Sequence, residues 1–320
     1  MVKKHKLRNN IFFGFLLLFI ILFAIFPFVQ MISTSLKYSW DWGNPSLIPI
    51  KVNTGAYEEL LGIGQDLKDL PESVQNLLNE TTDLTNEQRE SIIDKYRDTG
   101  DVFPFGEYFL NSLIFASSSA LISLLIAILG AYSFSRLQYK GRKVIQRGVL
   151  FVYMFGGILL LIPLYKVSVA LGLAGTQGGT VFSILIIYVV QTLPVSLYML
   201  GNYFRTIPFS IEEAAFIEGL NHFQTIWRVI IPLSLSAIAT VYIYAFMIAW
   251  NEYLFASVFL KSYKDIYTLS IGLKSLFVST NAIWDRIMAA SMLTALPVVF
   301  LFLLIQKQLT SGLTAGGVKE

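Results

Sequence analysis

The stretch Glu213-Ala-Ala-Phe-Ile-Glu-Gly219 is a polar, helix-prone segment between two long apolar runs. Ser210 lies three residues before Glu213, which is the spacing of a capping box and predicts a helix start. Pro208, just upstream, limits extension of that helix toward the preceding run. Gly219 permits the positive φ that ends one short helix before another begins. The stretch therefore predicts two short helices joined by a sharp bend.

The composition of the chain indicates a membrane protein. Of 320 residues, 55% are hydrophobic and 14% are charged, and the mean hydropathy is +0.62. A soluble domain of this length could not bury so much apolar surface, and several runs exceed the ~18 apolar residues that indicate a membrane-spanning helix. We therefore predict an all-α, polytopic membrane protein. The sequence contains no cysteine, which excludes disulfides and thiolate chemistry, and its two histidines are far apart, so we expect no metal site.

Six apolar runs are long enough to cross a bilayer as helices. They cover approximately residues 11–32, 108–137, 149–170, 180–204, 233–255 and 287–305. The first run follows Lys3, Lys4, Lys6 and Arg8, is longer than the core of a signal peptide, and is not followed by a small-residue cleavage site. We therefore predict that it is a first transmembrane helix, and that residues 1–10 form a basic N-terminus in the cytoplasm.

The charges beside these runs predict the topology. Residues 33–107 hold 14 of the 21 acidic residues against six Lys and Arg, which suits a small extracytoplasmic insertion, with helices predicted over 53–62 and 86–97. A dense basic cluster follows the second run: Arg136, Lys140, Arg142, Lys143 and Arg147. Basic loops next to spans lie in the cytoplasm, which explains this cluster far better than nucleic-acid binding does. Six spans then place both termini and the 205–232 segment on the cytoplasmic side.

Two kinds of polar or helix-breaking residue lie inside the predicted spans. Pro163 and Pro194 predict kinks, either static or linked to movement. Glu252 lies near the outer end of the fifth run, where a carboxylate is costly unless it is partnered or hydrated. It could line a polar path or lie in the headgroup zone, and we favour the headgroup zone.

The combination of Glu213-Ala214-Ala215, Gly219 and Pro232 resembles the cytoplasmic EAA loop of ABC importer permeases. The match is short, and an ordinary interfacial helix-turn-helix is the alternative. Other stretches are similar to the same family: Ser35-Leu36-Lys37, Asn111-Ser112-Leu113, Ala131 to Arg136, Pro163-Leu164-Tyr165, Leu171-Gly172-Leu173, Trp250 to Tyr253, and Ser311 to Lys319. The last is close to the tail of carbohydrate importers, particularly the smaller permease subunit of maltose and maltodextrin systems.

This resemblance implies the six-helix fold of the type I, MetI-like importer permeases. The permease core would be residues 108–305 with a cytoplasmic coupling loop at 205–232, preceded by the insertion at 33–107 and followed by a cytoplasmic tail at 306–320. The chain departs from the family in two places. After Met154 it has Phe155-Gly156-Gly157 where a proline is frequent, and the acidic stretch 62–102 is longer than in short members.

The resemblance also implies partners and site residues. They are a second permease in a heterodimeric pore, two ATPase subunits that bind ATP and Mg, an extracytoplasmic solute-binding protein, and a carbohydrate substrate. Residues implied to couple to the ATPase are Glu213, Ala214, Ala215, Gly219 and Pro232, and candidate tail contacts to it are Gly312, Gly316 and Gly317. Because the sequence has no phosphate-binding P-loop, we expect no catalytic residue and no cofactor in this chain. Its place would be the bacterial or archaeal cytoplasmic (inner) membrane.

Two other function classes remain as alternatives. A secondary transporter or channel would work without an ATPase, but it would need ionisable residues buried in the spans, and the spans contain few. A structural or sensory membrane protein would use the external segment alone. The sequence leaves open which sugar is carried, whether this chain touches it, and what the 62–102 stretch does.

Overall fold

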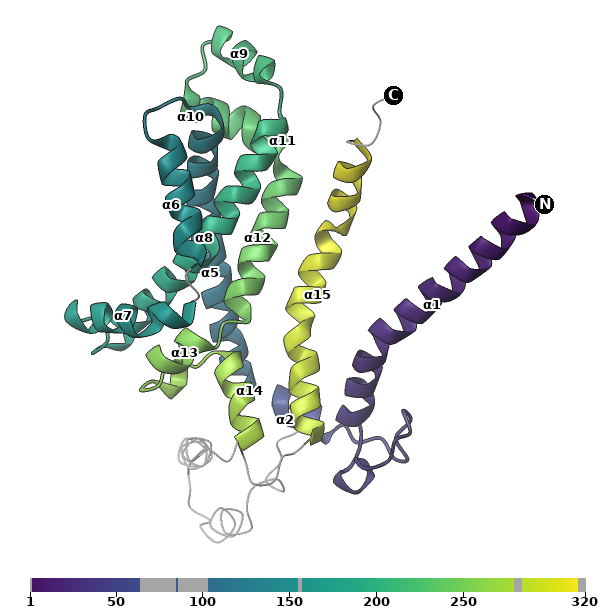
Figure 1. Cartoon of the computed structure of the whole chain (residues 1–320). Coiled ribbons are helices and arrows are strands. Elements are labelled where there is room, and N and C mark those ends of the chain that lie inside the picture. Colours follow the sequence, from purple (N-terminus) through teal and green to yellow (C-terminus); the bar gives the residue numbers. More distant parts are fainter. Residues whose placement is uncertain (1, 64–84, 86–102, 155–156, 279–283, 316–320) are drawn as a thin grey trace. The chain divides into compact units, whose positions relative to one another are not determined.

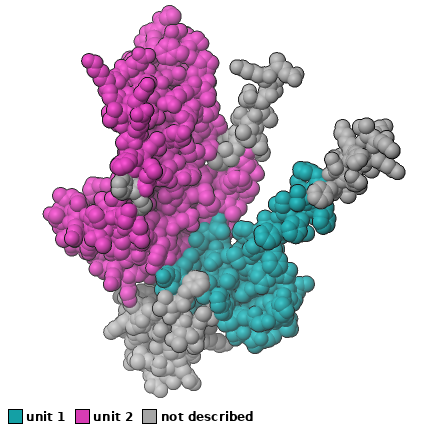
Figure 2. Space-filling model, viewed as in Figure 1, with its two compact units in different colours: residues 1–106, 273–295 teal, residues 107–272, 296–320 magenta. Residues whose placement is uncertain are grey.

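The computed structural model describes residues 2–63, 85, 103–154, 157–278 and 284–315. Within these residues every regular element is a helix, as the composition predicts (Figure 1). The chain divides into two compact units, residues 1–106 with 273–295 and residues 107–272 with 296–320 (Figure 2). The predicted helix at 86–97, and all of the 62–102 stretch apart from residues 62, 63 and 85, lie outside the described residues.

Five stretches of helix are long and apolar enough to cross a membrane. They are Phe13–Ser35 within α1 (Val2–Ser35), α5 (Phe105–Arg136), α8 (Gln177–Thr206), Leu235–Phe259, which comprises α12 (Leu235–Trp250) and α13 (Leu254–Phe259), and Trp284–Leu304 within α15 (Trp284–Ala315). Each coincides with one of the predicted spans. The sequence prediction of membrane-spanning helices is therefore confirmed for five of the six runs.

The predicted third span, residues 149–170, includes residues 155 and 156, which lie outside the described residues. It falls on the end of α6 (Arg142–Met154) and on α7 (Gly157–Ala170). With 14 residues α7 is only about 21 Å long, which is shorter than the ~30 Å hydrocarbon core. In Figure 1, α6 runs along α8 whereas α7 runs across it.

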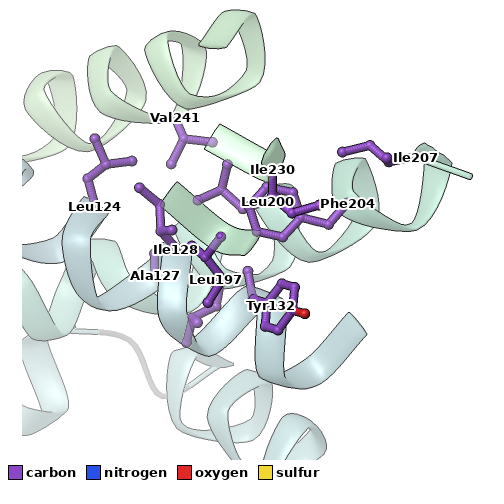
Figure 3. Close-up of a cluster of buried hydrophobic side chains, with 12 residues drawn as sticks. Leu124, Ala127, Ile128, Tyr132, Leu197, Leu200, Phe204, Ile207, Ile230 and Val241 are labelled. Atoms are coloured by element: carbon purple, nitrogen blue, oxygen red, sulfur yellow. The ribbon is translucent and has the colours of Figure 1, made fainter. Parts of the chain in front are cut away.

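The core of the second unit is an apolar cluster where α5, α8 and α12 pack together (Figure 3). Its members on α5 and α8 recur three or four residues apart, the spacing of one helix face. The buried residues are Leu124, Ala127, Ile128, Ala131, Tyr132, Leu197, Leu200, Phe204, Ile207, Ile226, Ile230 and Val241. The Leu197 side chain packs directly on Gly130, where an added Cβ would lie 2.5 Å from its Cδ2. The ends of this packed pair, Arg136 and Thr206, carry the candidate site.

The opposite end of α5 is tied to the segment that follows α13. This segment contains the 3₁₀ turn η5 (Lys264–Ile266) and the start of α14 (Leu269–Val278). The Asn111 side chain donates to the carbonyl oxygens of Asp265 (2.9 Å) and Tyr267 (3.1 Å). The hydroxyl of Ser112 accepts from the backbone N–H of Leu269 at 2.7 Å. These bonds satisfy backbone groups in a connection that has little regular structure of its own.

The first unit is organised around a buried lysine just after α1. Lys37 is fully buried, and its Nζ donates to the carbonyl oxygens of Asn44 and Ser46, both at 2.7 Å. The carboxylate of Asp41, in the turn η1 (Ser39–Asp41), accepts from the side chain of Asn44 (2.9 Å) and from the N–H of Ile50 (3.1 Å). These bonds fold residues 37–50 into a compact loop.

Within the same unit, the predicted helix over 53–62 is present as α2. It runs over Gly55–Leu61 and ends at Gly62, which has a φ of +65°. Glu59 of α2 forms an ion pair with Arg286, and Asn53 donates to Asp285 at 3.2 Å. The start of α15 is thereby attached to α2 and to the residue Asn53 just before it.

Candidate coupling site

The candidate site lies between α8 and α12, and its first helix is α9 (Phe209–Ile217). α9 begins directly after Pro208, whose ring fixes φ and which has no N–H to satisfy. Ser210 therefore lies inside the helix, and no side chain caps the first turn. The predicted capping box of Ser210 and Glu213 is wrong, because the proline sets the start of the helix earlier than the serine could.

The predicted bend after α9 is confirmed. Gly219 has a φ of +86°, in the left-handed region that favours glycine. The next helix, α10 (His222–Thr225), has the capping box that the sequence analysis placed elsewhere: Asn221 accepts from the N–H of Gln224 (2.9 Å), and Gln224 accepts from the N–H of Asn221 (3.0 Å). The segment is thus two short helices with a fixed bend between them.

The faces of α9 differ sharply in exposure. Glu212 and Ala215 are buried, whereas Glu213, Ala214 and Gly219 are exposed. Four of the five predicted coupling residues therefore lie together on this segment, but Ala215 faces inward. The buried glutamate is Glu212, which the sequence analysis did not single out. Its three-residue spacing from Ala215 puts the two on one helix face, and this spacing is the signal that could have found it.

Pro232, the fifth predicted residue, lies on a different element. It is exposed in the short helix α11 (Ile231–Leu233), after a five-residue π-helical turn, η4 (Ile226–Ile230). Because proline cannot donate to the carbonyl four residues earlier, it favours a local change in helix winding just before it. We assign Pro232 to the shape of this connection, and the exposed face of α9 is formed without it.

Glu212 is held by an ion pair inside the protein. The Nε of Arg136, the last residue of α5, lies 2.6 Å from Oε1 of Glu212, and the side chains are 9% and 1% exposed. The hydroxyl of Tyr132 donates to Oε2 of the same carboxylate at 3.2 Å. A buried carboxylate without such partners would be very costly, so α9 is anchored to α5 through these two side chains.

Arg136 also binds the end of α8. One of its terminal nitrogens donates to the carbonyl oxygens of Phe204 and Ile207, both at 2.6 Å. The Phe204 carbonyl also accepts from the N–H of Ile207 at 3.2 Å, and a positive charge is favoured at a helix C-terminus. The guanidinium also lies over the ring of Phe209, 6.0 Å from its centroid. One side chain on α5 therefore contacts the end of α8 and the start of α9.

Tyr132 extends the same cluster to the far side of the bend. Its hydroxyl lies 3.3 Å from Nδ1 of His222, and the His222 ring packs edge-on against Phe216 with centroids 4.9 Å apart. Figure 3 shows the ring of Tyr132 at the margin of the apolar cluster, with its oxygen at the outer end. Both short helices are thus attached to the same turn of α5.

The outer surface of the segment is apolar with acidic residues among the apolar ones. Ile217 is 87% exposed, and Glu213 on α9 and Glu218 directly after α9 are exposed too. Phe223 and Trp227, at and after α10, add further exposed apolar area. Such a surface offers docking area rather than catalysis. In the described ranges no three His, Cys, Asp or Glu side chains are arranged to hold a metal ion.

Glu252 is buried within the protein, and its position relative to the headgroup zone stays a prediction. It lies at the break between α12 and α13, where its carboxylate accepts from the N–H groups of Phe255 (2.8 Å) and Ala256 (3.0 Å). These bonds satisfy the start of α13, so the carboxylate is partnered by backbone.

Of the tail residues, Gly312 lies in α15, and Gly316 and Gly317 lie outside the described residues.

Comparison with known proteins identifies relatives over most of the chain. Residues 122–314 match the family "Binding-protein-dependent transport system inner membrane component". The Escherichia coli K12 inner membrane ABC transporter permease protein YcjP is 49% identical over 218 residues, 68% of this chain and 76% of that protein. The trehalose/maltose permease MalG of Thermococcus litoralis is 38% identical over 67% of this chain and 76% of its own length, and the E. coli K12 maltose/maltodextrin permease MalG is 29% identical over 100% and 99%.

A solved structure agrees in fold. The crystal structure of a bacterial ABC transporter involved in the import of the acidic polysaccharide alginate contains a chain with a TM-score of 0.70 and 23% identity, over 93% of this chain and 95% of that one. The family match over residues 122–314 argues against the alternatives of a secondary transporter and of a sensory protein. The chain belongs to the binding-protein-dependent transport system inner membrane components, and it is the multi-pass, non-catalytic permease subunit of an ABC importer.

Proposed function

We propose that this chain forms half of the pore of a carbohydrate importer, and that α9 receives the movement of the ATPase. The observation that carries the proposal is the division of α9 into two faces. Glu212 and Ala215 fix one face to the protein, and Glu213, Ile217 and Glu218 leave the other uncovered. A short helix held on one side and bare on the other can both dock and transmit displacement.

The uncovered face also suggests the chemistry of the surface that binds it. The protruding Ile217 needs an apolar pocket, and Glu213 and Glu218 favour basic residues around that pocket. We assign this docking surface to an ATPase subunit. ATP and Mg are bound there, and this chain contributes no residue to hydrolysis. Gly312, Gly316 and Gly317 remain candidate contacts of the tail to the same subunit.

Carbohydrate is the substrate class that the relatives support. Two relatives are named for trehalose, maltose or maltodextrin transport, and the structural neighbour imports a polysaccharide. We propose a heterodimeric pore with a second permease, two ATPase subunits and an extracytoplasmic solute-binding protein that selects the sugar. We assign no sugar ligand to this chain.

The proposed topology has six crossings, with both termini in the cytoplasm of a bacterial or archaeal cell. The five long apolar helices supply five crossings, and α6 and α7 together supply the third in sequence. The basic residues at 1–10 and 136–147 support a cytoplasmic location for those ends. Residues 33–107 form the extracytoplasmic insertion, 108–305 the permease core with the coupling loop at 205–232, and 306–320 the tail.

The test is affinity purification of the full chain from its native membrane, with bound subunits identified by mass spectrometry. We expect an ATPase and a second permease. Glu213→Lys reverses a charge on the docking face, and the recovered ATPase should fall about tenfold or more, as for an interface hot spot. Glu107→Lys is the matched control, because Glu107 is exposed at the other end of α5 and should leave recovery unchanged.

Purified complexes in proteoliposomes would then be offered labelled maltotriose, trehalose and an alginate trisaccharide. Import of one of them that requires ATP and the binding protein supports the carbohydrate assignment. An ATPase that is recovered equally with wild type and Glu213→Lys would contradict docking through α9. Import by this chain alone, without ATP, would contradict the proposed function as a whole.

A further inference from the structure

The connection between α8 and α9 is extended backbone outside both helices, so no helix of its own stiffens it. α8 ends at Thr206 and α9 starts at Phe209, so only Ile207 and Pro208 join them. Both have extended backbone, with ψ of 126° and 134°. Such a segment can still turn about φ and ψ of Ile207 and about ψ of Pro208, and it makes no hydrogen-bonded helix of its own. If the ATPase displaced α9, rotation at this joint would take up the displacement unless other contacts held α9 to α8.

Arg136, which belongs to α5, holds the joint between α8 and α9 through contacts on both sides of it. Its guanidinium donates to the carbonyl oxygens of Phe204 and Ile207 on the α8 side and forms an ion pair with Glu212 on the α9 side. The three partners come from both sides of the two-residue connection, and the arginine itself belongs to a third helix. The brace is therefore three-way: turning α9 about the joint would break the ion pair or the carbonyl bonds.

Tyr132 braces the other end of the coupling helix. It lies four residues before Arg136 on α5, hence one turn away on the same face. Its hydroxyl reaches both Glu212 and His222, so it contacts α9 and also α10 beyond the Gly219 bend. Two side chains on one turn of α5 thus hold the coupling helix near its start and past its end.

The chemistry of the brace argues for geometry rather than for stability alone. A buried ion pair gains little net stability over apolar packing, because its desolvation offsets its attraction. A guanidinium, however, holds several donors in one plane in fixed directions, which a lysine ammonium cannot reproduce. In this structure one terminal nitrogen of Arg136 binds two carbonyl oxygens, and its Nε forms an ion pair with Glu212 at the same time.

We propose that Arg136 is a positioning residue that locks α9 to the ends of α5 and α8, so that all three move as one body when the ATPase moves. The inference rests on the proposed coupling function of α9 and adds how displacement reaches the spans. Without the lock, the ATPase would still dock on α9 and hydrolyse ATP, but part of the movement would be lost at Ile207 and Pro208.

The test compares variants in the assembled complex, reconstituted in proteoliposomes with its ATPase, second permease and binding protein. Arg136→Lys keeps the charge and removes the planar fork, and Glu212→Gln keeps the shape and removes the charge. Arg142→Lys is the matched control, because the Arg142 guanidinium donates to the carbonyl of Leu137 in its own loop at 2.7 Å and does not touch α9. ATP hydrolysis and sugar import are measured on the same samples.

For Arg136→Lys we expect sugar imported per ATP hydrolysed to fall about tenfold, as for loss of a typical coupling free energy. Hydrolysis per assembled complex should stay near the wild-type value. The amount of sugar imported per ATP by Glu212→Gln should lie between the values of wild type and Arg136→Lys. Arg142→Lys should match wild type. A merely structural role would instead lower hydrolysis and import together, in proportion to the complex recovered.

Three results overturn the inference. An unchanged import-to-hydrolysis ratio in Arg136→Lys shows that the lock is not needed. A proportional loss of both activities shows that Arg136 serves folding or assembly only. Absence of ATP-driven import of maltotriose, trehalose or alginate trisaccharide in wild type removes the proposed function and this inference with it. Import by wild type therefore tests the proposed function, and the import-to-hydrolysis ratio of Arg136→Lys tests the positioning role of Arg136.

Discussion

At the scale of single residues, two adjacent glutamates have opposite environments. Glu212 is paired with Arg136 inside the protein, and Glu213 is exposed on the face we assign to docking. Sequence spacing identified the segment but favoured Glu213 alone, because only the position of α5 decides which face is covered. Removing one partner of such a buried pair typically costs about 3–5 kcal/mol, so Arg136→Ala is expected to reduce folding itself. The lysine variant is the sharper test for that reason.

Asp41 allows a pH prediction at the same scale. Burial acts to raise the pKa of its carboxyl, but the bonds from Asn44 and Ile50 and the charge of Lys37 together lower the pKa below its usual 3.8. A carboxyl with a lowered pKa stabilises the fold above its unfolded pKa, and this contribution is lost as the pH falls through the folded value. The loop over residues 37–50 should therefore loosen below about pH 4.

The measurement is protease protection of the 37–50 loop in purified complex between pH 6 and pH 3, using an acid-active protease. Wild type should lose protection toward the acidic end. Asp41→Asn, which removes the charge, should be less protected at pH 6 and should change less with pH. A variant as well protected and as pH-dependent as wild type would show that Asp41 does not hold the loop.

At the scale of elements, the start of α8 depends on a close backbone approach. A Cβ added to Gly179 would lie 2.3 Å from the carbonyl oxygen of Leu173, a backbone atom that cannot swing away. Gly179→Ala should therefore destabilise the protein by about 1–3 kcal/mol, in the range of overpacking. The neighbouring Gly178→Ala is the matched control, because its added Cβ would meet nothing within 4 Å. Thermal unfolding in detergent gives the comparison, and equal Tm values for the two variants would refute this packing argument.

The elements also show where sequence patterns were sufficient. Five long runs of apolar residues became five long helices, because length and hydropathy are what a membrane requires of a span. Gly219 took the positive φ that the bend needs. The capping box at Ser210 failed because Pro208 sets the helix start. The apolar run at 149–170 falls on α6 and α7, and the third crossing stays a prediction.

At the scale of the whole molecule, sequence predicted the architecture better than it predicted the site. The charge and hydropathy of long segments determine the class of protein, and the family match over residues 122–314 confirms it. The Arg136 cluster could not be predicted in this way. The contacts that Tyr132 and Arg136 make in it span 68 to 90 residues of the chain, and only the packing of α5 against α8 brings these residues together.

The central claim is that α9 is the element on which the ATPase docks, and photo-crosslinking tests it most directly. A photoreactive amino acid would replace Ile217, which is 87% exposed on α9, and in a control it would replace Ile48, which is 78% exposed in the loop after α1. Membranes containing the full complex are irradiated, and the adducts are identified by mass spectrometry. Our account predicts an adduct with the ATPase from position 217 and none from position 48. An irradiated complex in which position 217 yields no ATPase adduct, or no more than position 48, would contradict the account.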